Sequence, residues 1–145
     1  MKLPQYVTAT EVKRVCKQLG FRDWTKLKSP TVTIKEAKTI LAKVNVKKMK
    51  IDPEEFRRGL EVELEHGTQF DDANVTNNHP ILTGTIVLAH MKESLDYYKL
   101  LEVAELEGDL LKAVRSKNLK KIEEKYKKLI AAQVALHQAI AKQLR

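Results

Sequence analysis

Two pairs of residues in the middle of the sequence combine an imidazole with a carboxylate at helical spacing. Glu63 and His66 form the first pair, and His90 and Glu93 form the second. Side chains three residues apart lie on adjacent turns of the same helix face, so each pair presents both groups to one side. Two imidazoles and two carboxylates are enough to bind a single Zn, Fe or Mn ion. The sequence therefore makes Glu63, His66, His90 and Glu93 candidate ligands of one divalent metal.

The first pair requires a helix over residues 52–67, and the local signals for one are strong. An Asp cap is followed by Pro at the first helical position and by two Glu residues in the first turn, and a Gly marks the end. On a helical wheel, Glu63 and His66 fall beside the apolar residues, whereas Glu61 and Glu65 point to solvent. The carboxylate of Glu63 is therefore expected in the core, where it needs a partner.

The second pair lies in the stretch that should organise the rest of the chain. Residues 83–107 read as one helix of about six or seven turns, with a Thr cap and Gly108 as its stop. His90, Glu93 and Tyr97 share one side of it with apolar residues. Tyr97, one turn beyond Glu93, is a candidate to hydrogen-bond to one of the metal ligands and orient it.

One metal is favoured over two, and a site without metal stays open. A second ion would need further carboxylates, such as Glu102 or Glu105, and the wheel places both away from this face. The same imidazoles and carboxylates could instead hydrogen-bond to each other and to nearby backbone groups as a buried polar network. In that case the chain would have no cofactor at this position.

The remaining elements are helical as well, which predicts an all-α, single-domain bundle of four to six helices. Capping boxes open helices over residues 8–20 and 33–44, and a break at 116–118 precedes a long final helix to about Leu144. Residues 68–82 form a polar, turn-rich loop. In this loop, the acidic pair at 71–72 and His79 are more typical of turns than of ligands.

Length and composition fit one cytoplasmic domain. The chain has 145 residues, and no apolar run approaches the length of a membrane span. The N-terminus lacks the apolar segment of a signal peptide. A single cysteine, Cys16, excludes an internal disulfide and fits a reducing compartment, where it is expected to be a small core residue.

Charge is distributed in three blocks along the chain. Residues 1–50 carry 13 Lys or Arg against 3 Asp or Glu, residues 51–108 carry 4 against 13, and residues 109–145 carry 10 against 3. The basic flanks permit weak nucleic-acid binding, although no DNA-binding motif accompanies them. The apolar stripe of the last helix permits association with a second copy. A nucleic-acid accessory protein and a structural or adaptor protein are thus the alternatives to a metal-binding protein, and enzyme status stays open.

The central segments resemble an uncharacterised family of short proteins from bacteria and their phages. The resemblance rests on FRRGLEVELEHG at Phe56–Gly67, NVT at Asn74–Thr76 and TGTIVLAHMKESLDYYKLL at Thr83–Leu101. It covers residues 34–107 and leaves an N-terminal helical extension, 1–33, and a C-terminal helix, 109–145, outside. It implies no activity, only that the following residues stand at signature positions: Glu63, His66, His90, Glu93, Tyr97 and Tyr98.

Overall fold

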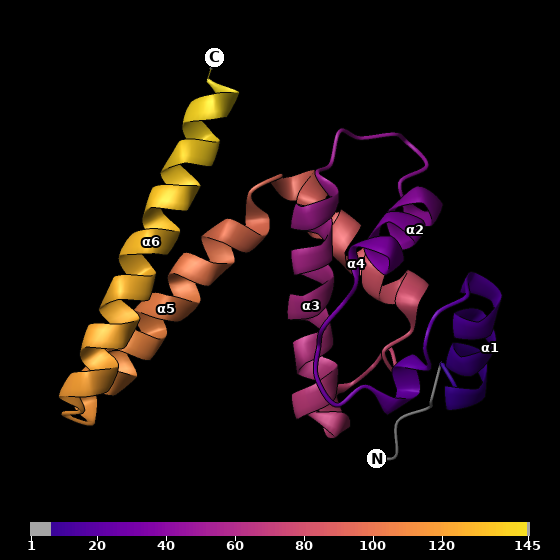
Figure 1. The fold of residues 1–145 in the computed structure, drawn as a ribbon, viewed down its shortest axis with the longest axis horizontal. Helices are drawn as coiled ribbons and strands as arrows, with labels where there is room; N and C mark the ends of the chain where they lie inside the picture. Colours follow the sequence, from indigo (N-terminus) through magenta and orange to yellow (C-terminus); the bar gives the residue numbers. More distant parts are fainter. Residues whose placement is uncertain (1–6, 145) are drawn as a thin grey trace. The chain divides into compact units, whose positions relative to one another are not determined.

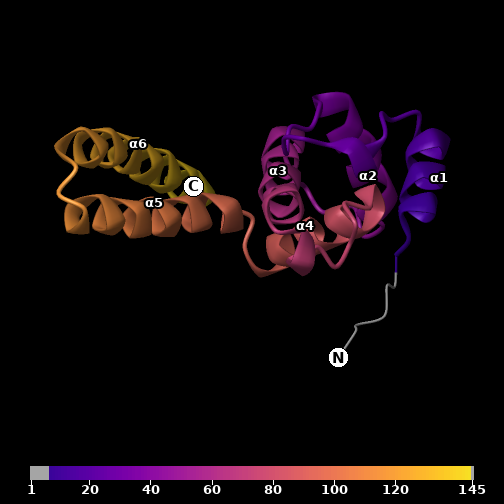
Figure 2. The same ribbon diagram turned by 90° about the horizontal axis from the view of Figure 1, so that it is seen from below.

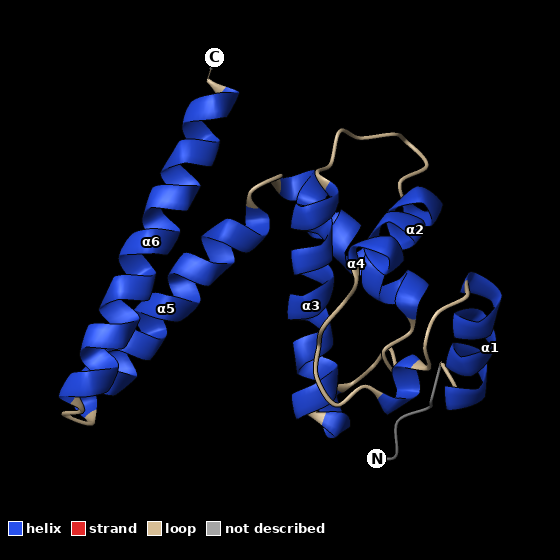
Figure 3. Cartoon of the chain, in the orientation of Figure 1, coloured by secondary structure: helices blue, strands red, loops and turns tan. Residues whose placement is uncertain are grey.

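The computed structural model describes residues 7–144, apart from the side chain of Asp71. Within that range the regular structure consists of six α-helices and two short 3-10 helices, with no strand (Figure 3). In chain order these are α1 Ala9–Leu19, η1 Trp24–Lys26, α2 Ile34–Val44, α3 Pro53–Gln69, η2 Asp71–Ala73, α4 Pro80–Glu93, α5 Tyr97–Arg115 and α6 Leu119–Gln143. The predicted all-α fold with a long C-terminal helix is confirmed.

The chain divides into two compact units, each of which is described separately below. The N-terminal unit is Met1–Glu93 and contains α1 to α4, and the C-terminal unit is Ser94–Arg145 and contains α5 and α6. The single domain expected from the chain length stays a prediction, because a division of contacts does not test whether the units fold independently. None of the helices within residues 7–144 is long and apolar enough to cross a membrane.

Helices of the N-terminal unit begin where short-range hydrogen bonds satisfy their first N–H groups. The Thr8 hydroxyl caps α1, which ends at Gly20 with a left-handed φ of 70°. Thr33 and Glu36 form the complete capping box of α2. Asp52 accepts hydrogen bonds from two backbone N–H groups at the start of α3. These starts are as the sequence predicts, because each depends on residues within one turn.

Three mutually packed helices, α2, α3 and α4, form the core of this unit, while α1 packs against η1 and α4 (Figures 1 and 2). Their largest fully buried side chains include Trp24, Ile40, Phe56, Leu60 and Leu64. Cys16 is 1% exposed, as predicted for a core residue, and burial raises the pKa of its thiol.

Glu36 is a buried carboxylate that ties the connector before α2 to the core. It accepts hydrogen bonds from Trp24 Nε1 at 3.1 Å, from the Thr33 backbone N–H at 2.8 Å and from Arg22 Nε at 3.3 Å. Burial raises the pKa of Glu36, but the hydrogen bonds from Thr33 and Trp24 and the charge of Arg22 outweigh it, so that the pKa is lowered overall. Glu36 is therefore ionised and fully occupied in a structural role.

The single helix predicted over residues 83–107 is wrong, because α4 ends at Glu93 and α5 begins at Tyr97. At the break, the Ser94 hydroxyl accepts a hydrogen bond from the Asp96 backbone N–H at 3.2 Å. A serine side chain that bonds nearby backbone competes in this way with helical hydrogen bonds. Gly108, predicted as a stop, lies inside α5, where packing against α6 overrides its poor helix propensity.

In the C-terminal unit, α5 and α6 form an antiparallel hairpin (Figure 1). The break predicted at 116–118 is confirmed: Lys117 has a positive φ of 53°, and the Asn118 side chain caps α6 by accepting from the Lys121 N–H at 3.0 Å. Small side chains in the interface, Ala113 and Ala132, allow the two helices to approach closely.

Candidate functional site

His90 lies between two carboxylates in the N-terminal unit. Packing of α3 against α4 places Glu63 Oε1 3.7 Å from His90 Nε2, and Glu93 Oε2 lies 3.7 Å from His90 Nδ1. These distances exceed the usual range of a hydrogen bond, about 2.7–3.2 Å. Because the two carboxylates approach different nitrogens, they lie at two different edges of the ring. The facing helices predicted from the sequence are therefore present, with Glu63 and His90 in contact.

The four predicted ligands differ strongly in burial. The Glu63 side chain is 16% exposed and that of His90 is 31% exposed, so both are only partly buried, whereas the sequence predicted them in the core. The predicted inward orientation of His66 and Glu93 is wrong, because His66 is exposed and the Glu93 side chain is 71% exposed. Both residues lie in the last turn of their helices, where fewer neighbouring elements cover the face that the wheel assigned to the core.

The face of α4 that the helical wheel assigned to the core is not the face that this helix buries. The residues that this helix buries are Pro80, Thr83, Gly84, Val87, Leu88 and Met91. Apolar residues occur all around α4, so its sequence does not define a single apolar face. His90 consequently lies at the boundary of the core instead of at its centre.

Glu61 was predicted to point to solvent, and this is wrong. It accepts a hydrogen bond from the Val32 backbone N–H at 2.9 Å and one from Arg57 Nη1 at 2.6 Å, and its side chain is only 26% exposed. It therefore fastens the segment before α2 to α3. Glu65 is exposed as predicted, with a hydrogen bond from Gln69 Nε2.

A cavity of about 190 Å³ lies beside Glu63, between α3, the loop that follows it and the first half of α4. It is lined by Glu63, His66, Gly67, Ala73, Asn74, Val75, Thr76, Thr83 and Ile86. These residues come from all three sequence segments that carry the family resemblance. Two of the predicted ligands, Glu63 and His66, thus share this cavity, while His90 and Glu93 are not among its lining residues.

The loop over the cavity is held by asparagine side chains packed against Gly67. Asn74 Nδ2 donates to the Gly67 carbonyl oxygen and to Asn78 Oδ1, at 3.1 Å each. A Cβ atom at position 67 would lie 2.1 Å from Asn78 Oδ1, so any larger residue would displace the loop. Gly67, predicted as the end of α3, is in fact inside the helix and is required for this close approach.

His79 was predicted to be a turn residue, but its imidazole caps α4. The backbone N–H groups of Ile81 and Leu82 donate to His79 Nδ1 at 3.2 and 3.3 Å. Helix α4 therefore starts at Pro80, three residues earlier than predicted, with Pro at its first position. Burial lowers the pKa of His79, and a neutral ring is what the cap requires, because Nδ1 accepts.

Thr83, which the sequence suggested as a helix cap, is a buried residue within α4 that lines the cavity. It is 2% exposed, and among the described residues no protein atom forms a hydrogen bond with its Oγ1. Sequence reasoning gave no functional role to Thr83, Asn74 or Thr76. Their place in the signature segments NVT and TG was the available signal, but only the fold shows that those segments meet.

No group of three or more His, Cys, Asp and Glu side chains in the described part of the chain is arranged to hold a metal ion. Tyr97 belongs to the C-terminal unit, where its ring meets that of Tyr98 edge-on with centroids 5.2 Å apart. That Tyr97 orients a metal ligand stays a prediction.

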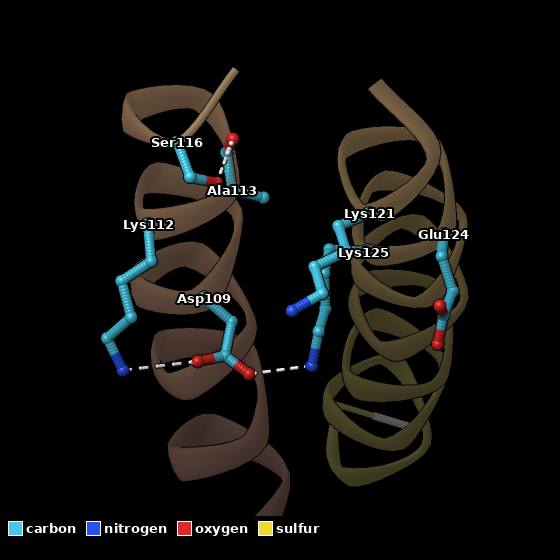
Figure 4. Close-up of a pocket in the computed structure, with 7 residues that line it drawn as sticks. All are labelled: Asp109, Lys112, Ala113, Ser116, Lys121, Glu124 and Lys125. Atoms are coloured by element: carbon cyan, nitrogen blue, oxygen red, sulfur yellow. Dashed lines mark hydrogen bonds and ion pairs between the residues drawn. The ribbon is translucent and has the colours of Figure 1, made fainter. Parts of the chain in front are cut away.

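The hairpin of the C-terminal unit has a separate, larger hollow of about 530 Å³. Lys112 and Lys125 reach Asp109 within it, from α5 and α6 respectively, at 3.2 and 2.7 Å (Figure 4). The hydrogen bond from Lys125 lowers the pKa of the Asp109 carboxyl and raises that of the Lys125 ammonium. Asp109, Lys112 and Lys125 already pair with each other at the surface. The hollow therefore has the features of a contact that pairs α5 with α6.

Together these features define a class of protein: an all-α chain whose N-terminal unit holds a small cavity, lined by polar and apolar residues, between two helices. The chain belongs to the family described as protein of unknown function (DUF5661), whose model matches residues 12–107. The sequence resemblance left residues 1–33 outside the family as an N-terminal extension, but the match includes most of α1. The C-terminal helix does lie outside it. No curated protein and no solved structure matches the chain.

Proposed function

We propose that the N-terminal unit binds a single divalent metal ion through Glu63, His66 and His90, with Glu93 orienting His90. The observation that carries the proposal is the position of the His90 ring, with a carboxylate 3.7 Å from each of its nitrogens. A histidine that ligates a metal through one nitrogen commonly donates its other N–H to a carboxylate, which fixes the tautomer and orientation of the ring. Nε2 and Glu63 are then the ligand side, and Nδ1 and Glu93 the orienting side.

Distances support a shared ion between Glu63 and His90. Ligand bonds to Zn are about 2.0–2.2 Å, so two ligands of a tetrahedral ion lie roughly 3.3–3.5 Å apart. The Glu63 oxygen and His90 Nε2 are separated by 3.7 Å, which small side-chain movements would close to that value. His66 is the third ligand because it lies one turn from Glu63 and lines the same cavity. Its exposed ring has room to turn toward the ion.

The competing structure is a polar network in which Glu63, His90 and Glu93 interact without a metal. Both structures need Glu63 near His90, but they differ in their need for charge. A metal requires the ionised carboxylate, whereas a network tolerates an amide of the same shape within about 1–3 kcal/mol.

The test is the thermal stability of the untagged protein with and without chelator. We expect chelator to lower the melting temperature and added Zn, Mn or Fe to restore it. A ligand at 100 times its dissociation constant contributes about 2.7 kcal/mol of stability. For a chain of this length that corresponds to a shift of very roughly 5–10 °C. His66→Ala, His90→Ala and Glu63→Gln should each abolish the response, and Glu93→Gln should weaken metal affinity about 10–100-fold.

Glu65→Gln is the matched control. It lies on the same helix as Glu63 but is exposed, and the metal response should persist in this variant. Glu61 is unsuitable as a control because it bonds Val32. A wild type that purifies without metal and ignores both chelator and added ions would contradict the proposal, leaving a buried polar network. The adaptor function, with association of copies through α6, would then be the better candidate, and it can be checked by sedimentation.

A further inference from the structure

The hairpin of α5 and α6 has an apolar surface that the contact between its two helices leaves uncovered. We propose that this surface packs against the same surface of a second copy of the chain, in antiparallel orientation, so that two hairpins form a four-helix bundle. Both α5 and α6 contribute to this interface. All residues involved belong to the C-terminal unit, so the pairing occurs with or without a metal in the N-terminal unit.

Apolar side chains of this unit are incompletely buried. Among its described residues, the large apolar side chains that are buried are those of Tyr98, Leu129 and Leu136. Ten other large apolar side chains of the unit are 40–83% exposed. Single exposed apolar residues are ordinary on a protein surface, whereas a contiguous patch of them marks an interaction surface. The question is therefore whether the ten residues lie together.

On α6, four of the exposed apolar side chains form one stripe along the helix: Leu119, Tyr126, Ile130 and Ile140. At about 100° per residue they lie within about 80° of each other. Their mean direction is about a quarter turn from that of the buried Leu129 and Leu136. Polar residues interrupt the stripe, but three of its members are separated by multiples of seven residues, the repeat of a helix-packing seam.

Helix α5 adds a second stripe on the same side of the hairpin. Its members are the exposed Leu100 and Val114 and the partly exposed Val103. They are rotated away from the buried Ala113 in the same sense in which the stripe of α6 is rotated away from its buried residues. Because α5 and α6 run antiparallel, rotations in the same sense along each chain lead to one face of the pair (Figure 1). The two stripes therefore form one apolar face.

The other face of the hairpin is polar. Lys112 of α5 and Lys121 and Glu124 of α6 line the hollow between the two helices (Figure 4). On a helical wheel, each of them lies roughly 150° from the apolar stripe of its own helix. The hairpin is thus amphipathic as a whole, and such a layer is stable when its apolar face packs against another layer.

The dimensions of the apolar face fit a second hairpin better than a single helix. With 19 residues in α5 and 25 in α6, the helices are about 29 and 38 Å long and each is about 10 Å wide. Two copies would then bury roughly 650 Å² each, or about 1,300 Å² in total, which is enough for a stable interface. A lone helix of another protein would cover one stripe, whereas a second copy covers both and completes a four-helix bundle.

Charge favours the antiparallel orientation. The half of the hairpin next to its turn, residues 107–131, holds eight Lys or Arg against four Asp or Glu. The rest of the unit, residues 94–106 and 132–145, holds three against three. A parallel pair would bring two basic halves together, and like charges repel each other. An antiparallel pair, related by a two-fold axis, places each basic half beside a neutral one.

The test is sedimentation equilibrium of the untagged full chain over a range of concentrations. Chelator is present throughout, so that a metal cannot bridge two copies and failure of the metal proposal leaves this result unaffected. We expect twice the chain mass of 16.6 kDa. The dimer should predominate above about 10 µM, because interfaces of this size have micromolar or tighter affinity.

Substitutions connect the dimer with the apolar face. The double variant Tyr126→Glu with Ile130→Glu should weaken dimerisation at least about 100-fold, because it places carboxylates in an apolar interface. Ala135→Glu is the matched control: this residue is exposed on α6, on the side opposite to the stripe, so the same charge should leave the dimer intact. Circular dichroism of both variants shows whether the helices are retained.

Oxidative cross-linking of single cysteine variants tests the orientation. Ile130 lies at the middle of α6, so in an antiparallel dimer it is close to its counterpart in the second copy. Leu119 lies at the start of α6, roughly 35 Å from its counterpart in the same dimer. We expect a disulfide-linked dimer of Ile130→Cys and none of Leu119→Cys. The unsubstituted chain is the control, since its own Cys16 is buried.

Three results would overturn the inference. The first is a monomer at every concentration up to about 100 µM, where an interface of this size should be occupied. The second is a dimer that persists in the Tyr126→Glu, Ile130→Glu variant. If that variant loses helical content, Tyr126→Ala with Ile130→Ala gives the same comparison, because alanine favours the helix and removes only the apolar surface. The third is cross-linking of Leu119→Cys instead of Ile130→Cys, which would contradict the antiparallel orientation.

Discussion

At the scale of single residues, two buried ionisable side chains, Glu36 and His79, have structural roles that require opposite chemistry. The Glu36 carboxylate must be charged, because it accepts from Trp24, Thr33 and Arg22, which hold its pKa below the ordinary value despite burial. The His79 ring must be neutral, because Nδ1 accepts from the backbone N–H groups at the start of α4. Glu36 and His79 therefore both make the free energy of unfolding depend on pH, each in a different pH range.

His79 predicts a loss of stability in mildly acidic solution. Burial lowers the pKa of His79 in the folded state below its ordinary value of 6.5, although the nearby Glu11 opposes this and Arg14 assists it. Below pH 6.5 the unfolded chain takes up a proton that the folded chain does not, so the free energy of unfolding decreases as the pH decreases. The contribution of His79 is complete above pH 6.5 and is lost as the pH falls through the folded-state pKa. Urea denaturation at several pH values measures it.

Substitutions of His79 distinguish its role as a helix cap from the effect of its protonation. His79→Asn keeps a side-chain acceptor and should remove this part of the pH dependence, while His79→Ala should cost about 1 kcal/mol at neutral pH. His137→Asn, on an exposed position of α6, is the control and should keep the wild-type profile. A His79→Asn profile that is parallel to that of the wild type between pH 5 and about 6.5 would contradict the assignment.

At the scale of helices, the contact of α2 with α4 depends on the missing side chain of Gly84. A Cβ atom at this position would lie 2.3 Å from Ile40 Cγ2, and Ile40 is fully buried. The two helices therefore approach each other at a distance that alanine does not allow. This contact sets the position of α4, and with it the positions of Thr83 and His90.

Gly84→Ala should therefore destabilise the protein by about 1–3 kcal/mol, the usual effect of overpacking, even though alanine favours helix formation. Gly108→Ala is the matched control, since a Cβ atom at that position in α5 meets nothing within 4 Å. That variant should be more stable than the wild type by about 0.5–1 kcal/mol. Thermal unfolding of both variants provides the comparison. Similar effects of both substitutions would mean that helix propensity, and not packing, decides at position 84.

At the scale of the whole molecule, charge permits association with nucleic acid but does not favour it strongly. The net formal charge is +8, yet several lysines of α6 are already paired. Lys127 and Lys128 contact Glu123 and Glu124 at 2.5 and 2.8 Å, and Lys125 contacts Asp109. Exposed pairs of this kind contribute little to stability, but they reduce the positive potential of the surface.

We therefore expect weak, sequence-independent binding to DNA that falls steeply with salt, as counterion release requires. Fluorescence anisotropy with a labelled oligonucleotide at about 0.05 and 0.3 M salt measures this. Replacing Lys120 and Lys121 by Gln should reduce the salt dependence by about one unit of slope for each phosphate contact that is lost. Tight binding that survives 0.3 M salt would instead support a nucleic-acid accessory function.

What the sequence determined by itself about this protein is the set of features that depend on neighbours within one turn. The caps at Thr8, Thr33 and Asp52, the break before Asn118 and the buried Cys16 are all as predicted. Glu63 and His66 both lie in α3, the helix that the sequence predicted for them. Such signals are local hydrogen bonds and amphipathic patterns, so that residue order is sufficient to define them.

What only the tertiary structure decided depends on residues far apart in the chain. Glu61 looked solvent-exposed on its own helix, but it bonds Val32, 29 positions away. The apolar surface on all sides of α4 left its buried face undetermined until α2 and α3 packed against it. The cavity beside Glu63 forms because the loop after α3 folds back on Gly67, bringing three separated signature segments together. Contacts of this kind are set by packing in three dimensions, which no local pattern of residues encodes.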